Sequence, residues 1–106
     1  MKYYMIAEVH VHDRAWVPDY LADVDPIVRA YGGEFLARSP KVERLEGEGA
    51  PAGVVTAIAF PSRQAALDFY TSEAYRPYRE ARQAGASTRM VLVAGMDIAS
   101  EQRAAD

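Results

Sequence analysis

The segment Val54–Phe60 limits the folds open to this chain, because it is apolar on both faces of an extended strand. Its sequence, VVTAIAF, contains no charged residue and is rich in β-branched residues, which favour strands. The segment Met90–Ala94 is also apolar throughout. An antiparallel sheet with one face in water alternates apolar and polar residues. We therefore expect a sheet that is covered on both faces.

Hydrophobic periodicity and turn residues predict the other elements. Spacing of two residues indicates strands, and spacing of three and four residues indicates helices. Serines 62 and 72 suit helix N-caps, and Gly32 suits a left-handed helix end. Pro26 is expected to kink the first helix. The predicted order is strand 3–11, helix from about Pro18 to Tyr31, strand 34–38 bent at Ser39-Pro40 and resuming over 42–45, strand 54–60, helix 62–70, short helix 72–85, and strand 88–94.

This order predicts a ferredoxin-like α+β fold, βαββαβ. We expect a four-stranded antiparallel sheet in the spatial order four, one, three, two, with the helices on one face. One domain would span residues 1–96, and residues 97–106 would form a polar, frayed C-terminal tail.

The second face of the sheet predicts a homodimer, since the two predicted helical regions cover one face only. A second copy of the same sheet is the simplest cover, and a stable interface would bury at least about 1,200 Å2. The alternative is an exposed apolar face that binds a ligand or another protein.

Composition excludes several classes of function. The chain has 106 residues, a net charge of −3 and no cysteine. The acidic balance argues against nucleic-acid binding, and the missing cysteines exclude disulfides and zinc–thiolate sites. No apolar run reaches the about 18 residues of a membrane span. We expect a cytoplasmic protein.

Several stretches together resemble a known family. They are YGGEFLAR at 31–38, VERLEG at 42–47, FPS at 60–62, Phe69-Tyr70 with Ser72 and Tyr75, and VLV at 91–93. The chain resembles the 1330 family of domains of unknown function over about residues 3–95. The resemblance implies a dimeric α+β barrel, in which two ferredoxin-like sheets pack face to face. Wider relatives include cofactor-free monooxygenases, lactone isomerases and haem-binding proteins. The chain departs from the family pattern at Glu34, where a basic residue is frequent, and at Ala59 and Ala94, where acids are expected.

The first strand carries the main candidates for chemistry. Glu8, His10 and His12 share one face because they are spaced by two residues. Glu8 and His10 are predicted to be a general acid–base pair in the dimer interior, and the alternative is a pair of polar contacts across the interface. A His-x-His pair can also bind a transition metal, but no further cluster supports a metal, so no metal site is assigned.

The predicted pocket lies in the dimer interior above the small residues of the third strand. Arg38 is predicted to hold a carboxylate or enolate through its forked guanidinium, and the alternative is an ion pair with Glu8 or an acid of the partner. The predicted ligand contacts are Tyr4, Ile6, Leu36, Ala57 and Ala59.

These residues lead to two functional hypotheses. The first is a cofactor-independent oxygenase or isomerase that binds a small apolar or aromatic carbonyl compound. The second is a non-catalytic ligand-binding or assembly module. The sequence leaves open whether the protein is an enzyme.

Overall fold

The structure, a computed structural model, describes residues 1–100. Four strands and three helices follow one another along the chain. Their bounds are β1 (Tyr3–Val11), α1 (Val17–Ala30), β2 (Glu34–Ser39), β3 (Val54–Phe60), α2 (Arg63–Tyr70), α3 (Arg76–Gly85) and β4 (Ala86–Ala94).

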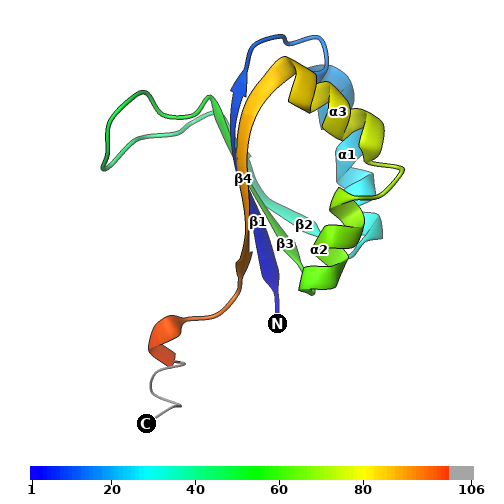
Figure 1. Cartoon of the computed structure of the whole chain (residues 1–106), viewed down its shortest axis with the longest axis vertical. Helices are drawn as coiled ribbons and strands as arrows, with labels where there is room; N and C mark the ends of the chain where they lie inside the picture. The colour runs from blue at the N-terminus through cyan, green and yellow to red at the C-terminus, as the bar shows by residue number, and fades with distance from the viewer. Residues whose placement is uncertain (101–106) are drawn as a thin grey trace.

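The strands form one antiparallel sheet in the order β2-β3-β1-β4. All three helices cover the same face of that sheet (Figure 1). The predicted fold class and strand order are therefore confirmed, with the second helical region divided into α2 and α3. No helix within residues 1–100 is long and apolar enough to cross a membrane.

Two of the predicted capping residues, Ser62 and Gly32, lie at helix ends, whereas Ser72 does not begin α3, whose N-cap is Tyr75. The Ser62 hydroxyl accepts a hydrogen bond from the Ala65 N–H at 3.0 Å at the start of α2. The Ser72 hydroxyl accepts one from the Tyr75 N–H at 3.2 Å, just before α3. Gly32 has a φ of +79°, so it ends α1 in the left-handed conformation that glycine favours. The helix α1 continues through Pro26.

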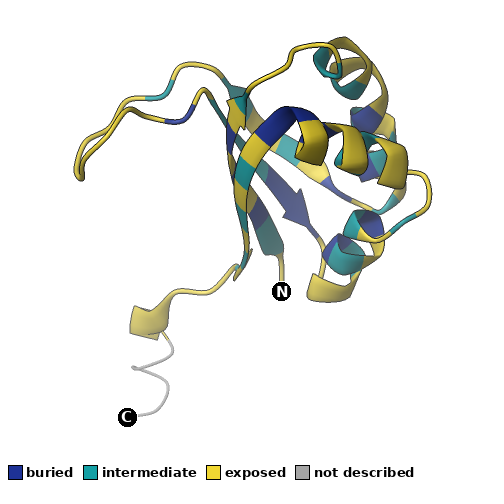
Figure 2. Ribbon diagram, turned by 45° about the horizontal axis from the view of Figure 1, so that its top comes forward, coloured by how far each residue is buried: buried dark blue, intermediate teal, exposed yellow. Residues whose placement is uncertain are grey.

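The main hydrophobic core lies between the helices and the helix-facing side of the sheet (Figure 2). Met5, Ile58 and Phe60 supply the sheet side of that core. The Phe69 ring packs on the Tyr75 ring with centroids 4.3 Å apart, and both side chains are almost fully buried. Burial of side chains this large stabilises a fold by about 1.5–3 kcal/mol each.

The opposite side of the sheet, here called the open face, is not covered by any element within residues 1–100. Strand register assigns its residues, because Ile6 pairs with Ala57 on one side and with Val91 on the other. Val91 is 57 % exposed and Val93 is 42 % exposed. The open face comprises Tyr4, Ile6, Glu8, His10, Val55, Ala57, Ala59, Ser87, Arg89, Val91 and Val93.

A β-bulge in β2 overturns one part of the predicted register. The pairing shifts between Phe35 and Ala37, so that Ala37 pairs with Ala57 and Arg38 pairs with Thr56. Arg38 therefore lies on the helix-facing side of the sheet. The expectation that Arg38 lies with Glu8 in the dimer interior is wrong. Leu36 occupies the bulge and is exposed.

Residues 40–53 form an extended connection, here called the arm, between β2 and β3. Figure 1 shows the arm projecting from the sheet on the side away from the helices. The predicted continuation of the strand over 42–45 is wrong, because these residues form no ladder. Instead, the Arg44 guanidinium donates to the carbonyl oxygens of Gly49 at 2.8 Å and Ala50 at 3.1 Å.

The predicted tail lies partly outside the described residues. Residues 98–100 are helical, and residues 101–106 are not described.

Candidate functional site

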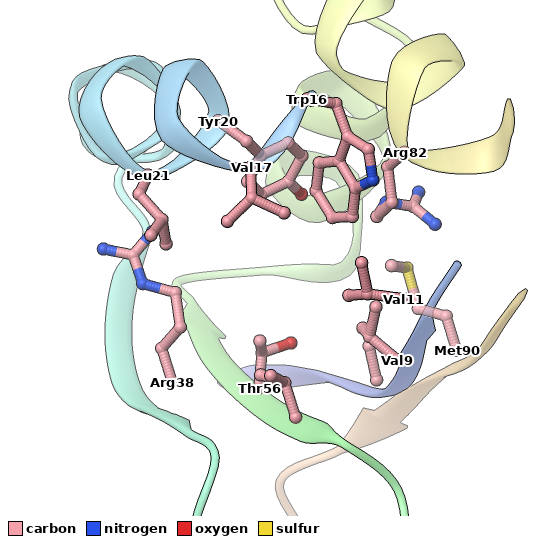
Figure 3. A pocket seen from close by; sticks show the side chains of 12 residues that line it. Val9, Val11, Trp16, Val17, Tyr20, Leu21, Arg38, Thr56, Arg82 and Met90 are labelled. Atoms are coloured by element: carbon pink, nitrogen blue, oxygen red, sulfur yellow. The ribbon is translucent and has the colours of Figure 1, made fainter. Parts of the chain in front are cut away.

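A pocket lies between the helix-facing side of the sheet and helices α1 and α3 (Figure 3), and we call it the helix-side pocket. Its volume is about 80 Å3, well below the roughly 300–1,000 Å3 of drug-sized pockets, so it suits a small compound. Most of its wall is apolar. The apolar lining residues are Ala7, Val9, Val11, Val17, Leu21, Val54 and Met90, and the others are Trp16, Tyr20, Arg38, Thr56 and Arg82.

A glycine makes room for the largest of these side chains. A Cβ atom built on Gly85 would lie 2.5 Å from the indole Nε1 of Trp16, which is closer than real Cβ contacts. The missing side chain at the end of α3 therefore allows Trp16 to reach the pocket wall. There the indole packs edge-on against the Tyr20 ring, with centroids 5.3 Å apart.

The α3 end of the pocket holds a buried arginine. Arg82 is 4 % exposed, and its guanidinium lies beside the phenol oxygens of Tyr20 and Tyr75. Those two oxygens are 2.5 Å apart in a hydrogen bond. Its Nε has no hydrogen-bond partner within residues 1–100.

The Tyr20 phenol next to Arg82 stays neutral, whereas the arginine stays charged. Burial raises the pKa of Tyr20 well above its ordinary value, and the contact with Tyr75 raises the pKa further. Burial alone would lower the pKa of Arg82, but the phenol oxygens of Tyr75 and Tyr20 outweigh burial and raise it. This end of the pocket therefore carries a positive charge.

The opposite end of the pocket holds Arg38, next to Leu21 of α1 (Figure 3). Its guanidinium carbon stacks over the Phe35 ring, 4.3 Å from the centroid. The Arg38 Nη1 is buried and has no hydrogen-bond partner in the described chain. The pocket thus has an apolar body with a guanidinium at each end, an arrangement suited to a small molecule with electron-rich oxygens.

Most of the residues predicted for the site lie elsewhere, on the open face. Tyr4, Ile6, Glu8, His10, Ala57 and Ala59 share that face, as the predicted register requires. In the single chain Glu8 and His10 are exposed, opposite Arg89 and Ser87 respectively. Because Arg38 lies on the other side of the sheet, the structure does not bring the three predicted catalytic residues together. Their catalytic roles stay predictions.

The histidines do not converge with acids on one point. The His12 Nε2 is hydrogen-bonded to the Ser87 hydroxyl at 2.7 Å. Within residues 1–100 no group of three His, Asp or Glu side chains is placed to hold a metal ion.

Sequence reasoning missed the residues that distinguish the helix-side pocket. Arg82 follows Tyr75 by seven residues and Tyr78 by four, so it shares their face of the helix. An arginine in phase with an aromatic stripe was the available signal. Trp16 and Tyr20 stand at helical spacing in the sequence, and the gap between them and the sheet has no signature there.

Comparisons with known proteins identify relatives without fixing an activity. The sequence matches the family described as "Domain of unknown function (DUF1330)" over residues 2–96. No protein with a curated description matches the chain.

Three solved structures illustrate the similarity in fold. RPA0582 of Rhodopseudomonas palustris, a protein of unknown function, is 19 % identical, with 91 % of this chain and 83 % of that chain covered and a TM-score of 0.76. A dimeric ferredoxin-like protein of unknown function from Jannaschia sp. CCS1 is 12 % identical, with coverages of 89 % and 99 % and a TM-score of 0.74. SnoaB, a cofactor-independent oxygenase from Streptomyces nogalater, is 14 % identical, with coverages of 91 % and 94 % and a TM-score of 0.66. At such identities the likeness shows the fold alone.

Proposed function

Because this chain belongs to the DUF1330 family of domains of unknown function, its activity has to be inferred from its own site, and we propose that it binds a small apolar or aromatic carbonyl compound in the helix-side pocket. One observation carries the proposal: the pocket is apolar along its length and has an arginine at each end. Apolar walls with a few polar groups are the usual build of a small-ligand site. The location differs from the dimer interior predicted from the sequence.

The polar groups favour an electron-rich oxygen on the ligand. The Arg38 Nη1 at one end is a buried donor without an acceptor in the described chain. A carbonyl, enolate or phenolate oxygen would satisfy this donor through a charge-assisted hydrogen bond.

Oxygenase chemistry without a cofactor is the catalytic form of this proposal. SnoaB, which shares the fold, is a cofactor-independent oxygenase. An enolate or phenolate held against a guanidinium is the kind of electron-rich carbon compound that such chemistry requires. However, no lining residue is an acid or a histidine, so the pocket has no evident general base. The lack of a general base favours either a ligand that ionises readily by itself or a protein that binds its ligand without catalysis.

Matched valine variants test the location of the ligand. Val54 lines the helix-side pocket, and its neighbour Val55 pairs with Glu8 on the open face. We expect acetophenone, used as a probe, to raise the melting temperature of the native protein by mass action. Val54→Phe should abolish that rise because the added ring fills the pocket, whereas Val55→Phe should keep it. Equal losses in both variants would contradict this location.

A homodimer formed through the open faces is the assembly we propose. Its apolar surface around Val91 and Val93 is supporting evidence, since exposed apolar patches on a sheet mark interaction sites. The dimeric ferredoxin-like neighbour from Jannaschia adds support at the level of the fold. In such a dimer Glu8 and His10 would lie in the interface, where polar contacts with the partner are the simplest role.

A further inference from the structure

Arg82 is a buried charge for which the described chain supplies no counterion. It is the one charged side chain within residues 1–100 that is buried. Two exposed arginines do have carboxylate partners, since Arg29 pairs with Asp25 at 3.0 Å and Arg76 pairs with Glu80 at 3.1 Å. No ion pair within residues 1–100 includes Arg82. A buried cation without an acid is costly in free energy, and an anionic ligand would remove that cost.

Two hollows meet at this arginine. Arg82 and Met90 line the helix-side pocket, and both also line a second, more polar cleft between α3 and β4. The cleft measures about 380 Å3, and Thr88 and Gln83 contribute to its wall. A ligand can therefore place an apolar body in the pocket and a charged group at Arg82.

The buried polar side-chain atoms without a partner can all donate hydrogen bonds. Four buried side-chain atoms in the described chain lack a hydrogen-bond partner, namely Trp16 Nε1, Arg38 Nη1, Arg82 Nε and Thr88 Oγ1. Trp16 and Arg82 stand side by side at the α3 end of the pocket (Figure 3), and Thr88 shares the adjoining cleft with Arg82. An indole N–H and a guanidinium have no acceptor capacity, and the threonine hydroxyl can donate as well. Arg82 therefore shares the pocket with one unpaired donor and the cleft with another, and donors without an acceptor favour an anionic oxygen.

We propose that the ligand is a monocarboxylic acid with a small apolar or aromatic body, whose carboxylate is held by Arg82 with Trp16 and Thr88 as further donors. The planar fork of a guanidinium matches the two oxygens of a carboxylate. The proposal rests on the proposed function, because the apolar body occupies the helix-side pocket. It adds the charge of the ligand and its orientation, with the carboxylate toward α3.

Two isosteric probes separate this inference from the proposed function. Benzoate and benzamide have the same ring and nearly the same shape, but only benzoate is charged. We expect the full chain at neutral pH to bind benzoate about tenfold more tightly than benzamide in calorimetric titrations, since a charge-assisted pair is worth at least that ratio. Equal affinities for the two probes would overturn the carboxylate assignment and leave the proposed function intact. Failure of both to bind would count against both proposals.

Variants of the same helix give the matched controls. Arg82→Met should still bind benzamide, but it should bind benzoate and benzamide about equally. Arg76→Met, an exposed change on α3, should keep the native ratio of the two affinities. Thr88→Val serves as a second, nearly isosteric variant and should weaken benzoate alone. Retention of the full preference in both Arg82→Met and Thr88→Val would overturn the assignment.

Inorganic phosphate tests whether the site binds anions in general. Phosphate is an anion without an apolar body, and we expect it to compete with benzoate only weakly. Competition by phosphate at the same concentration as benzoate would indicate a general anion site and would overturn the assignment to an apolar carboxylic acid.

Discussion

At Gly85 two effects of opposite sign compete. In a helix, replacing glycine with alanine is favourable by up to about 1 kcal/mol. Here, however, the new Cβ would lie 2.5 Å from Trp16 Nε1 and 3.1 Å from the Asp13 carbonyl oxygen. Because interiors are closely packed, relieving such overlap costs roughly 1–3 kcal/mol. We therefore expect Gly85→Ala to lower the free energy of unfolding by about 1–2 kcal/mol in urea titrations.

Gly53→Ala is the control for that change. Its Cβ would meet only the Val9 carbonyl oxygen, at 3.4 Å, which is an ordinary contact. The control should be neutral within about 0.5 kcal/mol. If Gly85→Ala proved equally neutral, Trp16 would not be confined as described.

Tyr20 predicts how stability changes with alkaline pH. Burial raises its pKa in the folded chain far above the value of about 10 that it has when unfolded. The contribution of the neutral phenol is complete below about pH 10 and is lost as the pH rises further, because only the unfolded chain then releases the proton. Tyr20→Phe removes this proton. Its unfolding free energy, measured by denaturant titration between pH 8 and 11.5, should fall less steeply than that of the native chain, and parallel curves would refute the assignment.

At the scale of elements, β2 shows what could be predicted from the sequence and what could not. Strands and helices followed from periods of two and of three to four residues, because one face of each element packs on the core. The bulge between Phe35 and Ala37 has no comparable signature. One extra residue reverses the facing of every later side chain in a strand. That reversal places Arg38 on the helix-facing side of the sheet. Arg38 is therefore separated from Glu8 and His10, the other two predicted catalytic residues, which lie on the open face.

The arm illustrates a second limit of sequence reasoning. Residues 42–45 are predicted to resume the second strand, but in the structure they have no neighbouring strand with which to pair. The conformation of the arm depends instead on hydrogen bonds from the Arg44 side chain to backbone carbonyl oxygens. The residue types of a short segment contain no information about such contacts.

Arg44 should therefore control the order of the arm and little else. Arg44→Met removes the donors to Gly49 and Ala50, so we expect faster cleavage after Glu46 or Glu48 by a glutamyl endopeptidase. The global unfolding free energy should change by less than about 0.5 kcal/mol, because the arm is exposed. The Lys41→Met variant, also changed in the arm, should be cleaved by the endopeptidase at the native rate. Identical cleavage rates for both variants would exclude this role of Arg44.

At the scale of the whole molecule, we expect the open face to decide the oligomeric state. Val91→Glu would place a charge in the proposed interface, where it has no partner and is costly to bury. We expect this variant to be monomeric at micromolar concentration by light scattering, while the native chain is dimeric. Ala84→Glu on the exposed surface of α3 introduces the same charge elsewhere and should stay dimeric. A monomeric native chain would remove the basis for this assembly.

The small residues on β3 separate the two candidate locations for a ligand. Ala57 lies on the open face, between Ile6 and Ala37. Ala57→Phe would fill any hollow between two paired sheets without reaching the helix side. We expect benzoate binding to survive this change, as measured by calorimetry. Loss of binding in a variant that is still folded and dimeric would place the ligand in the dimer interior instead.

The alternation of facing along β3 has a consequence for how proteins of this kind diversify. Val54 and Thr56 line the pocket, while Val55 and Ala57, their immediate neighbours, lie on the open face, where we propose the dimer interface. A codon change at one position can alter ligand preference, and a change at the next can alter assembly, with little interference between them. Selection can therefore act on two interleaved sets of positions within one short strand. A family built in this way can acquire new ligands while keeping its quaternary structure.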